Sequence, residues 1–179
     1  MTIEDLAIQG KDTNLSCAER TYNNLYKMRN KVLMNTFLRK ETHHRNHLII
    51  TIKGVSFVDD SMSNSPNATW FTLYQSTVPV IWIVENLNDK DIDLSGQLST
   101  IKDKVKGVIF VGDSNKSKKM LSQLRKITNI VETSTLSDAV ELAFHLAAEG
   151  MSVVYSPASG TVEKALERSK EYNDCVYDL

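Results

Sequence analysis

The chain has 179 residues, of which 41% are hydrophobic and 24% charged, so it is long and apolar enough to fold around a core of its own. Its 21 basic and 22 acidic side chains leave a net charge of −1, which argues against a surface for nucleic acid or anionic membrane. Two widely separated cysteines, a polar N-terminus and the lack of an apolar run of about 20 residues lead us to expect a cytoplasmic protein with reduced thiols.

The first part of the chain divides into a helical segment and a hairpin. Residues 1–40 carry apolar side chains at helical spacing and are predicted to be mainly helical. Two β-rich runs follow at 47–52 and 55–60. Lys53-Gly54 between them predicts a β-hairpin, because glycine accepts a positive φ at little cost.

Strand-like and helix-like segments alternate through the rest of the chain. Ser65-Pro66 predicts a helix start, and a later amphipathic helix is expected to end at Gly150. Further strands are expected at 78–85, 107–111, 129–132 and 151–156. Near-continuous apolar strands separated by helices predict an α/β, Rossmann-like, doubly wound fold, with a mostly parallel sheet and helices on both faces.

Common phosphate-binding and catalytic motifs are missing from this sequence. It contains no GxxxxGK[ST], GxGxxG, GxSxG or HExxH, and no metal-spaced group of cysteines and histidines. We therefore expect that the chain cannot run ATP-dependent chemistry alone and that it holds no metal.

A first polar loop, residues 42–47, precedes a predicted strand and contains three histidines and Arg45. His43 and His44 would point to opposite sides of an extended segment. A solvated turn is therefore favoured over a metal site, with an anion contact by Arg45 as an alternative.

Two more polar loops follow predicted strands, where open α/β sheets bind their ligands. Residues 59–65 place two aspartates, then serine and asparagine, before a helix; residues 155–161 place small and hydroxyl side chains before the last helix. The first loop is either a polar ligand cradle or a set of side chains that satisfy loop and cap backbone groups. The second suits a carboxylate or phosphate, although helix capping explains the same residues.

Each motif is unspecific by itself, but together their order and spacing resemble the Mur ligase family. The similarity is strongest in VSFVDDSMSNSPNATWFTL, VPVIWIV and VVYSPASGT. It implies that residues 1–40 resemble the end of the family's central domain and residues 41–179 its C-terminal Rossmann-like domain. The branch that the chain resembles most adds D-glutamate to UDP-N-acetylmuramoyl-L-alanine in peptidoglycan precursor synthesis, with ATP and Mg²⁺.

The resemblance also implies roles for individual residues. The positions implied in nucleotide binding are His44, Arg45 and Asp60. The positions implied in substrate binding are Asn64, Lys90, Ser159 and Thr161. Of these, Asn64 stands where the family has threonine, and Lys90 only approximately fills the place of a lysine. No catalytic or metal-binding residue is assigned.

The chain departs from the family at charged positions. Met62 stands where the family's Asp-Ser-Lys motif has its lysine, and Glu85-Asn86 stand where it has two glycines. Further acidic residues follow at Asp89, Asp91 and Asp93. A ligase that forms an acyl phosphate must stabilise accumulated negative charge, so a lost cation and added carboxylates predict an eroded site.

Three interpretations follow from this pattern. The favoured one is a stand-alone, degenerate Mur ligase C-terminal-like domain that is not catalytic alone and acts as a binding or interaction module. The second is a fragment of an active ATP-dependent ligase whose ATPase domain lies outside this chain. The third is a Rossmann-like domain with an unrelated ligand. The expected partners are ATP or ADP, an amino-acid carboxylate or another protein, but neither nucleic acid nor membrane.

Overall fold

The structure is a computed structural model that describes residues 45–87 and 91–179. The predicted helical segment 1–40 and two predicted site residues, His44 and Lys90, lie outside the described residues. All described residues belong to one compact unit.

The predicted hairpin is confirmed. Strand β1 (His47–Ile52) pairs antiparallel with β2 (Val55–Asp59), and Lys53 and Gly54 form the turn with φ angles of 48° and 79°. Both central residues therefore have positive φ, as the tight hairpin turn predicted here requires. This hairpin forms one edge of the sheet and contributes the only antiparallel strand pair among the described residues.

The remaining elements alternate as predicted. In chain order they are α2 (Pro66–Gln75), β3 (Val80–Glu85), α3 (Leu98–Lys104), β4 (Val105–Val111), the 3₁₀ turn η1 (Ser114–Lys116), α4 (Lys118–Leu124), β5 (Ile130–Thr133), α5 (Leu136–Leu146), β6 (Ser152–Tyr155) and α6 (Val162–Tyr177).

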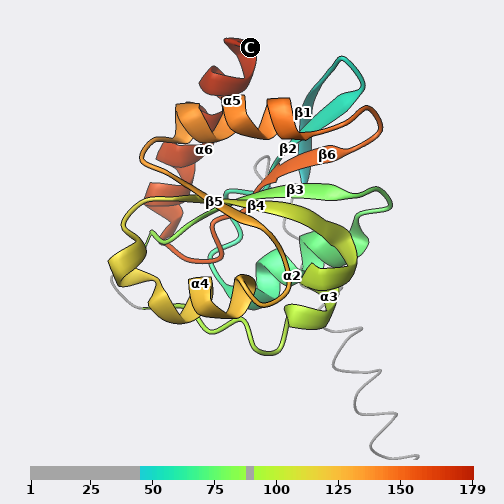
Figure 1. Cartoon of the computed structure of the whole chain (residues 1–179). Helices are drawn as coiled ribbons and strands as arrows, with labels where there is room; N and C mark the ends of the chain where they lie inside the picture. The colour runs from blue at the N-terminus through green and yellow to red at the C-terminus, as the bar shows by residue number, and fades with distance from the viewer. Residues whose placement is uncertain (1–44, 88–90) are drawn as a thin grey trace, which may run out of the picture. The chain divides into compact units, whose positions relative to one another are not determined.

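The six strands form one sheet in the order β1-β2-β6-β3-β4-β5, and every neighbouring pair except β1–β2 is parallel. The last strand, β6, lies between β2 and β3, which brings the ends of these three strands together (Figure 1).

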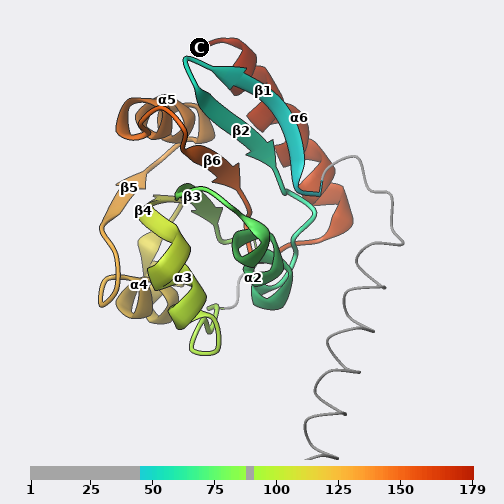
Figure 2. The same ribbon diagram turned by 90° about the vertical axis from the view of Figure 1, so that its right-hand side faces the viewer.

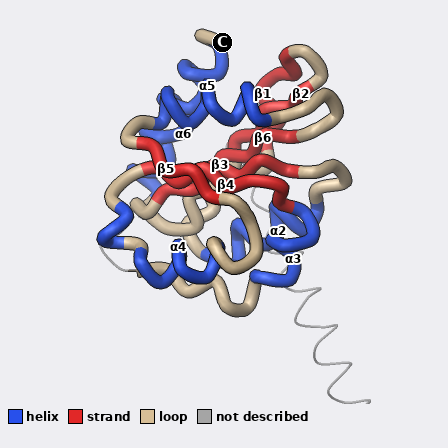
Figure 3. The backbone as a smooth tube through the Cα atoms, viewed as in Figure 1, coloured by secondary structure: helices blue, strands red, loops and turns tan. Residues whose placement is uncertain are grey.

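Helices cover both faces of the sheet, which confirms the predicted layers. Helices α2, α3 and α4 lie on one face, and α5 and α6 lie on the other (Figures 2 and 3). Alternate residues of β3 enter two separate cores: Trp82 packs with α2–α4, whereas Ile81 and Ile83 pack with α5 and α6. Burial on both faces explains why this strand is a continuous apolar run in the sequence.

The predicted end of α5 is wrong by four residues. The helix ends at Leu146, and Ala147 is already extended with φ −78° and ψ 135°. Gly150, where the helix was expected to end, instead has φ 83° and donates its N–H to the carbonyl of Gly54 at 2.9 Å. Helix propensity alone favours a longer helix, but the chain must leave α5 early to begin β6 beside β2.

Candidate functional site

The carboxyl ends of β2, β6 and β3 form the candidate site, because ligands of open parallel sheets bind outside these ends. The structure brings the two predicted strand-end loops together there. The N–H of Asp60 donates to the carbonyl of Tyr155 at 2.9 Å, and the N–H of Ser156 donates to the carbonyl of Ile83 at 3.0 Å. The loops after β2 and β6 therefore lie side by side.

Asp60 is completely buried at the centre of this site. Its Oδ1 accepts the N–H of Asn46 at 3.1 Å, and its Oδ2 accepts the hydroxyl of Ser156 at 2.7 Å. Ser156 Oγ also lies 2.7 Å from the hydroxyl of Thr69 in α2. Burial raises the pKa of Asp60 to about 6, although these hydrogen bonds oppose the shift.

Arg45 is the second predicted nucleotide contact and lies close enough to Asp60 for their charges to interact. Burial lowers the pKa of this half-buried guanidinium, and the charge of Asp60 opposes that shift. The β1–β2 hairpin thus brings together two residues that are 15 positions apart. Both oxygens of Asp60 accept internal hydrogen bonds, so in this conformation Arg45 is the more accessible member of the pair.

The loop between β2 and α2 contains Met62 and Asn64. Asn64 is exposed and its N–H donates to the carbonyl of Met62 at 3.0 Å, while its predicted contact with substrate stays a prediction. Ser65 caps α2 by accepting the N–H of Ala68, which confirms the predicted helix start. The hydroxyl of Ser61 is buried and has no hydrogen-bond partner among the residues that the structure describes.

The loop between β6 and α6 is held by internal contacts. The hydroxyl of Ser159 accepts the N–H of Leu87 at 2.8 Å, so it ties this loop to the one after β3. Thr161 is exposed and caps α6 by accepting the N–H of Lys164 at 3.4 Å. The capping interpretation thus accounts for Thr161, while its predicted contact with substrate stays a prediction.

Glu85 carries a contact that the sequence did not reveal. Its side chain is 5% exposed at the end of β3, where Oε2 accepts the hydroxyl of Tyr155 at 2.9 Å and Oε1 pairs with Arg168 of α6. Arg168 also pairs with Glu171. Burial raises the pKa of Glu85, and Arg168 partly offsets this. Arg168 is 83 positions away, so no local pattern identifies it as the partner.

A second buried carboxylate, Asp59, lies on the same face of the sheet as Glu85. Its Oδ1 accepts the N–H of Ser61 at 2.9 Å, and its Oδ2 accepts the hydroxyl of Ser169 and the amide of Asn173. Polar contacts therefore anchor α6 to the ends of both β2 and β3.

The acidic residues after β3 are also engaged by the chain itself. Asp91 accepts the N–H groups of Lys119 and Met120 at 2.6 and 3.3 Å, at the N-terminal end of α4. Asp93 pairs with Lys119 at 2.7 Å and accepts the amide of Gln123 at 2.8 Å, and these contacts hold its pKa below the usual range. These two charges stabilise the start of α4, where its dipole favours anions.

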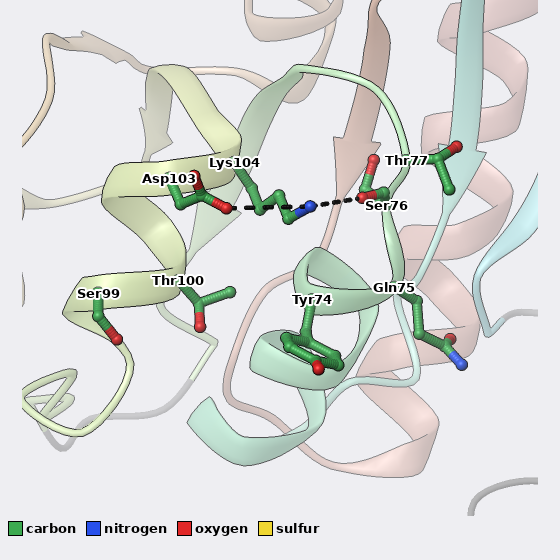
Figure 4. A pocket seen from close by; sticks show the side chains of 8 residues that line it. All are labelled: Tyr74, Gln75, Ser76, Thr77, Ser99, Thr100, Asp103 and Lys104. Atoms are coloured by element: carbon green, nitrogen blue, oxygen red, sulfur yellow. Dashed lines mark hydrogen bonds and ion pairs between the residues drawn. The ribbon is translucent and has the colours of Figure 1, made fainter.

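A separate groove of about 600 Å³ lies between α3 and the end of α2, the end opposite the capped start that leads out of the β2 loop (Figure 4). Tyr74 lines it and stacks on Trp70, with 5.2 Å between ring centroids. Lys104 lies between Asp103 and the carbonyl of Ser76, to which it donates at 3.1 Å. The opposite charges of Asp103 and Lys104 in this groove therefore lie next to each other.

No group of three or more histidine, cysteine, aspartate or glutamate side chains within 45–87 and 91–179 could hold a metal ion. In the same residues, no helix is long and apolar enough to cross a membrane.

Comparison with known proteins decides the family. The chain is 27% identical over 185 aligned positions to the UDP-N-acetylmuramoylalanine–D-glutamate ligase of Christiangramia forsetii, and the match covers all of the chain and 41% of that protein. It is 33% identical to the corresponding ligase of Porphyromonas gingivalis over 69% of the chain and 27% of that protein. This chain is related to the Mur ligases.

The resemblance to the Mur ligases that the sequence predicted is confirmed. The chain spans less than half the length of these two Mur ligases. A solved Mur ligase, the UDP-N-acetylmuramate-alanine ligase of Thermotoga maritima, aligns with 74% of the chain at 11% identity and a TM-score of 0.49. No protein-family model matches the chain.

Proposed function

We propose that this protein is a Mur ligase C-terminal-like module that acts by binding, in the bacterial cytoplasm, and does not catalyse D-glutamate addition alone. The observation that carries the proposal is that the chain's own groups engage two buried carboxylates at the candidate site, Asp60 and Glu85. Asp60 is bonded to Ser156 and the backbone of Asn46, and Glu85 is paired with Arg168.

The balance of charge at the site supports the proposal. Ligation through an acyl phosphate needs cations that stabilise developing negative charge. Met62 supplies none at the position where the family has lysine, and Arg168 is paired with two glutamates. Lys164, in the first turn of α6, donates to the carbonyl of Leu87 at 2.8 Å. In this conformation these three positions offer a substrate no unengaged cation.

The proposal is tested by incubating the purified chain with ATP, Mg²⁺, D-glutamate and UDP-N-acetylmuramoyl-L-alanine and measuring phosphate release. We expect no release above the rate without protein, and none from Met62→Lys, because that variant restores only one of the missing features. The D-glutamate ligase of Porphyromonas gingivalis serves as the positive control. Substrate-dependent phosphate release by the unmodified chain would contradict the proposal.

A second candidate function is that of one domain of an active ATP-dependent D-glutamate ligase. It is favoured by Arg45 and Asp60, which retain the family's residue types and lie near each other. In that case Arg45 would contact the phosphates of ATP or ADP, with Mg²⁺ neutralising part of their charge.

Titration calorimetry with Mg·ADP distinguishes the two candidates. A retained nucleotide face predicts saturable binding that Arg45→Ala weakens by about 1–3 kcal/mol, the usual range for a hydrogen bond to a charged group. The matched control is Arg125→Ala, because Arg125 is exposed and pairs with Glu132 on β5. Equal affinity of Arg45→Ala and Arg125→Ala for ADP would show that Arg45 does not contact the nucleotide. No binding at millimolar ADP would favour a protein as the partner.

A further inference from the structure

The chain enters the domain through a constrained residue. Asn46 immediately precedes β1 and has a φ of 48°, in the left-handed region that costs an ordinary residue energy but that asparagine tolerates. Its N–H donates to Oδ1 of Asp60 at 3.1 Å, and its side-chain amide lies 3.5 Å from the side-chain oxygen of Gln75 on α2. The strongest of these contacts is therefore the one to Asp60.

Asp60 connects this entry point to the body of the domain. Its other oxygen accepts the hydroxyl of Ser156, which in turn contacts Thr69 on α2. A single carboxylate thus links the start of β1 to α2 and to the end of β6.

Within residues 45–87 and 91–179, the charged surroundings of Asp60 are sparse. Arg45 interacts with it electrostatically at the start of β1, while α2 and the β6 end contribute hydroxyls. The neighbouring carboxylate, Asp59, is bonded instead to Ser61 and α6. His47 follows Asn46 on β1 and is exposed.

We propose that Asp60 is a protonation-controlled latch on the junction at Asn46. As a carboxylate it accepts the N–H of Asn46 in a charge-assisted hydrogen bond, and as a carboxylic acid it accepts this N–H more weakly. Hydrogen bonds to an ionised acceptor are roughly twice as strong as those between neutral groups. The attraction between Asp60 and Arg45 also exists only while the aspartate is charged.

Burial brings the charge change of Asp60 close to neutral pH, because it raises the pKa of this carboxyl to about 6. The latch would then be closed at neutral pH and open below about pH 6. Keeping a buried carboxylate charged also costs stability, so the closed latch holds the junction at the expense of the stability of the domain. If the contact only stabilised the fold, its removal would lower the stability of the domain. This inference does not depend on the proposed function.

The test is hydrogen exchange at the amide of Asn46, followed by NMR in the full chain at pH 5 and pH 7.5 and corrected for the intrinsic exchange rate. A His47→Gln background removes the imidazole that follows Asn46 in the chain. We expect protection of Asn46 to fall about tenfold from pH 7.5 to pH 5. In Asp60→Asn, a mimic of the neutral acid, it should be low at both pH values.

Asp59→Asn is the matched control, since Asp59 is an adjacent buried carboxylate that faces α6. It should leave the pH dependence of Asn46 protection unchanged. Protection that is the same at both pH values, or that Asp59→Asn abolishes equally, would overturn the proposal. If Asp60→Asn lowers global stability at pH 7.5 together with local protection, Asp60 is a structural contact and the latch is rejected.

Discussion

Glu85 at the end of β3 and Arg168 in α6 form a partly buried ion pair across the interface between the sheet and its last helix, with the carboxylate as the buried member. Tyr155 donates its hydroxyl to the same carboxylate, and burial raises the pKa of this tyrosine well above its usual value. The buried carboxylate of Glu85 is therefore satisfied by two donors of the chain itself, Tyr155 and Arg168. Glu85 stands where the Mur ligase resemblance leads one to expect glycine. The chain therefore has a carboxylate at this position, and Arg168 neutralises it.

Arg168→Ala should be strongly destabilising, because it leaves Glu85 buried without its cation. We expect a loss of about 3 kcal/mol, the lower end of the range for a broken buried pair, since Arg168 is 30% exposed. Arg125→Ala breaks an exposed pair and should cost less than about 1 kcal/mol. Urea unfolding measures both. Adding Glu85→Gln to Arg168→Ala should recover part of the lost stability. Equal destabilisation by Arg168→Ala and Arg125→Ala would show that the pair with Glu85 is no stronger than an exposed one.

Asp60 should make the domain less stable as the pH rises from 4 to 6. Its folded pKa of about 6 lies above the ordinary aspartate value of 3.8, so the folded state binds the proton more tightly than the unfolded state. This difference in pKa corresponds to about 3 kcal/mol of stability, which is fully present below pH 4 and lost as the pH passes through 6. Asp60→Asn should remove this component from urea midpoints measured between pH 4 and 8. A pH profile identical to that of the unmodified chain would show that Asp60 does not titrate in this way.

Gly160→Ala should destabilise the loop between β6 and α6. Gly160 has a φ of 121°, which side chains with a Cβ rarely adopt, and an added Cβ would lie 3.1 Å from the side chain of Leu87. We expect a cost of about 1–3 kcal/mol in thermal or urea unfolding. Gly96→Ala is the control, because nothing lies within 4 Å of its added Cβ, and it should be nearly neutral. Equal costs would show that the loop adapts to the extra carbon.

Asp91→Ala should weaken α4, because the carboxylate accepts two N–H groups at the start of that helix. Loss of such a cap costs about 0.5–2 kcal/mol. Asp103→Ala removes an exposed carboxylate from α3 and should change stability by less than about 0.5 kcal/mol. Amide exchange in α4 would reveal whether the loss is local, and uniform loosening of the whole domain would argue against a capping role.

Elements whose signals are local were predictable from the sequence. The turn at Lys53-Gly54, the cap at Ser65-Pro66 and the apolar run of β3 each reflect a backbone or burial requirement that neighbouring residues reveal. The end of α5 was not predictable, because it depends on the pairing of Gly150 with Gly54, 96 positions earlier.

The candidate site was predictable in its loops but not in its contacts. Residues 59–65 and 155–161 were expected near strand ends and do meet there, since parallel strands present their carboxyl ends at one edge. Whether a carboxylate such as Asp60 faces a ligand or an internal donor depends on residues far away in the chain. The same holds for Glu85, whose partner on α6 no spacing rule identifies.

The position of β6 in the sheet has a consequence for how the domain assembles. β2 and β3 each pair with β6 and not with each other, so the sheet has a gap at its centre until the sixth strand inserts. Contacts between positions as distant as Ser56 and Ser152 make such insertion slow and place it late. Asp60 meets Ser156 only at that step. In a chain that has folded without β6, the hydroxyl of Ser156 is therefore not yet bonded to Asp60. The candidate site forms only once β6 is in place.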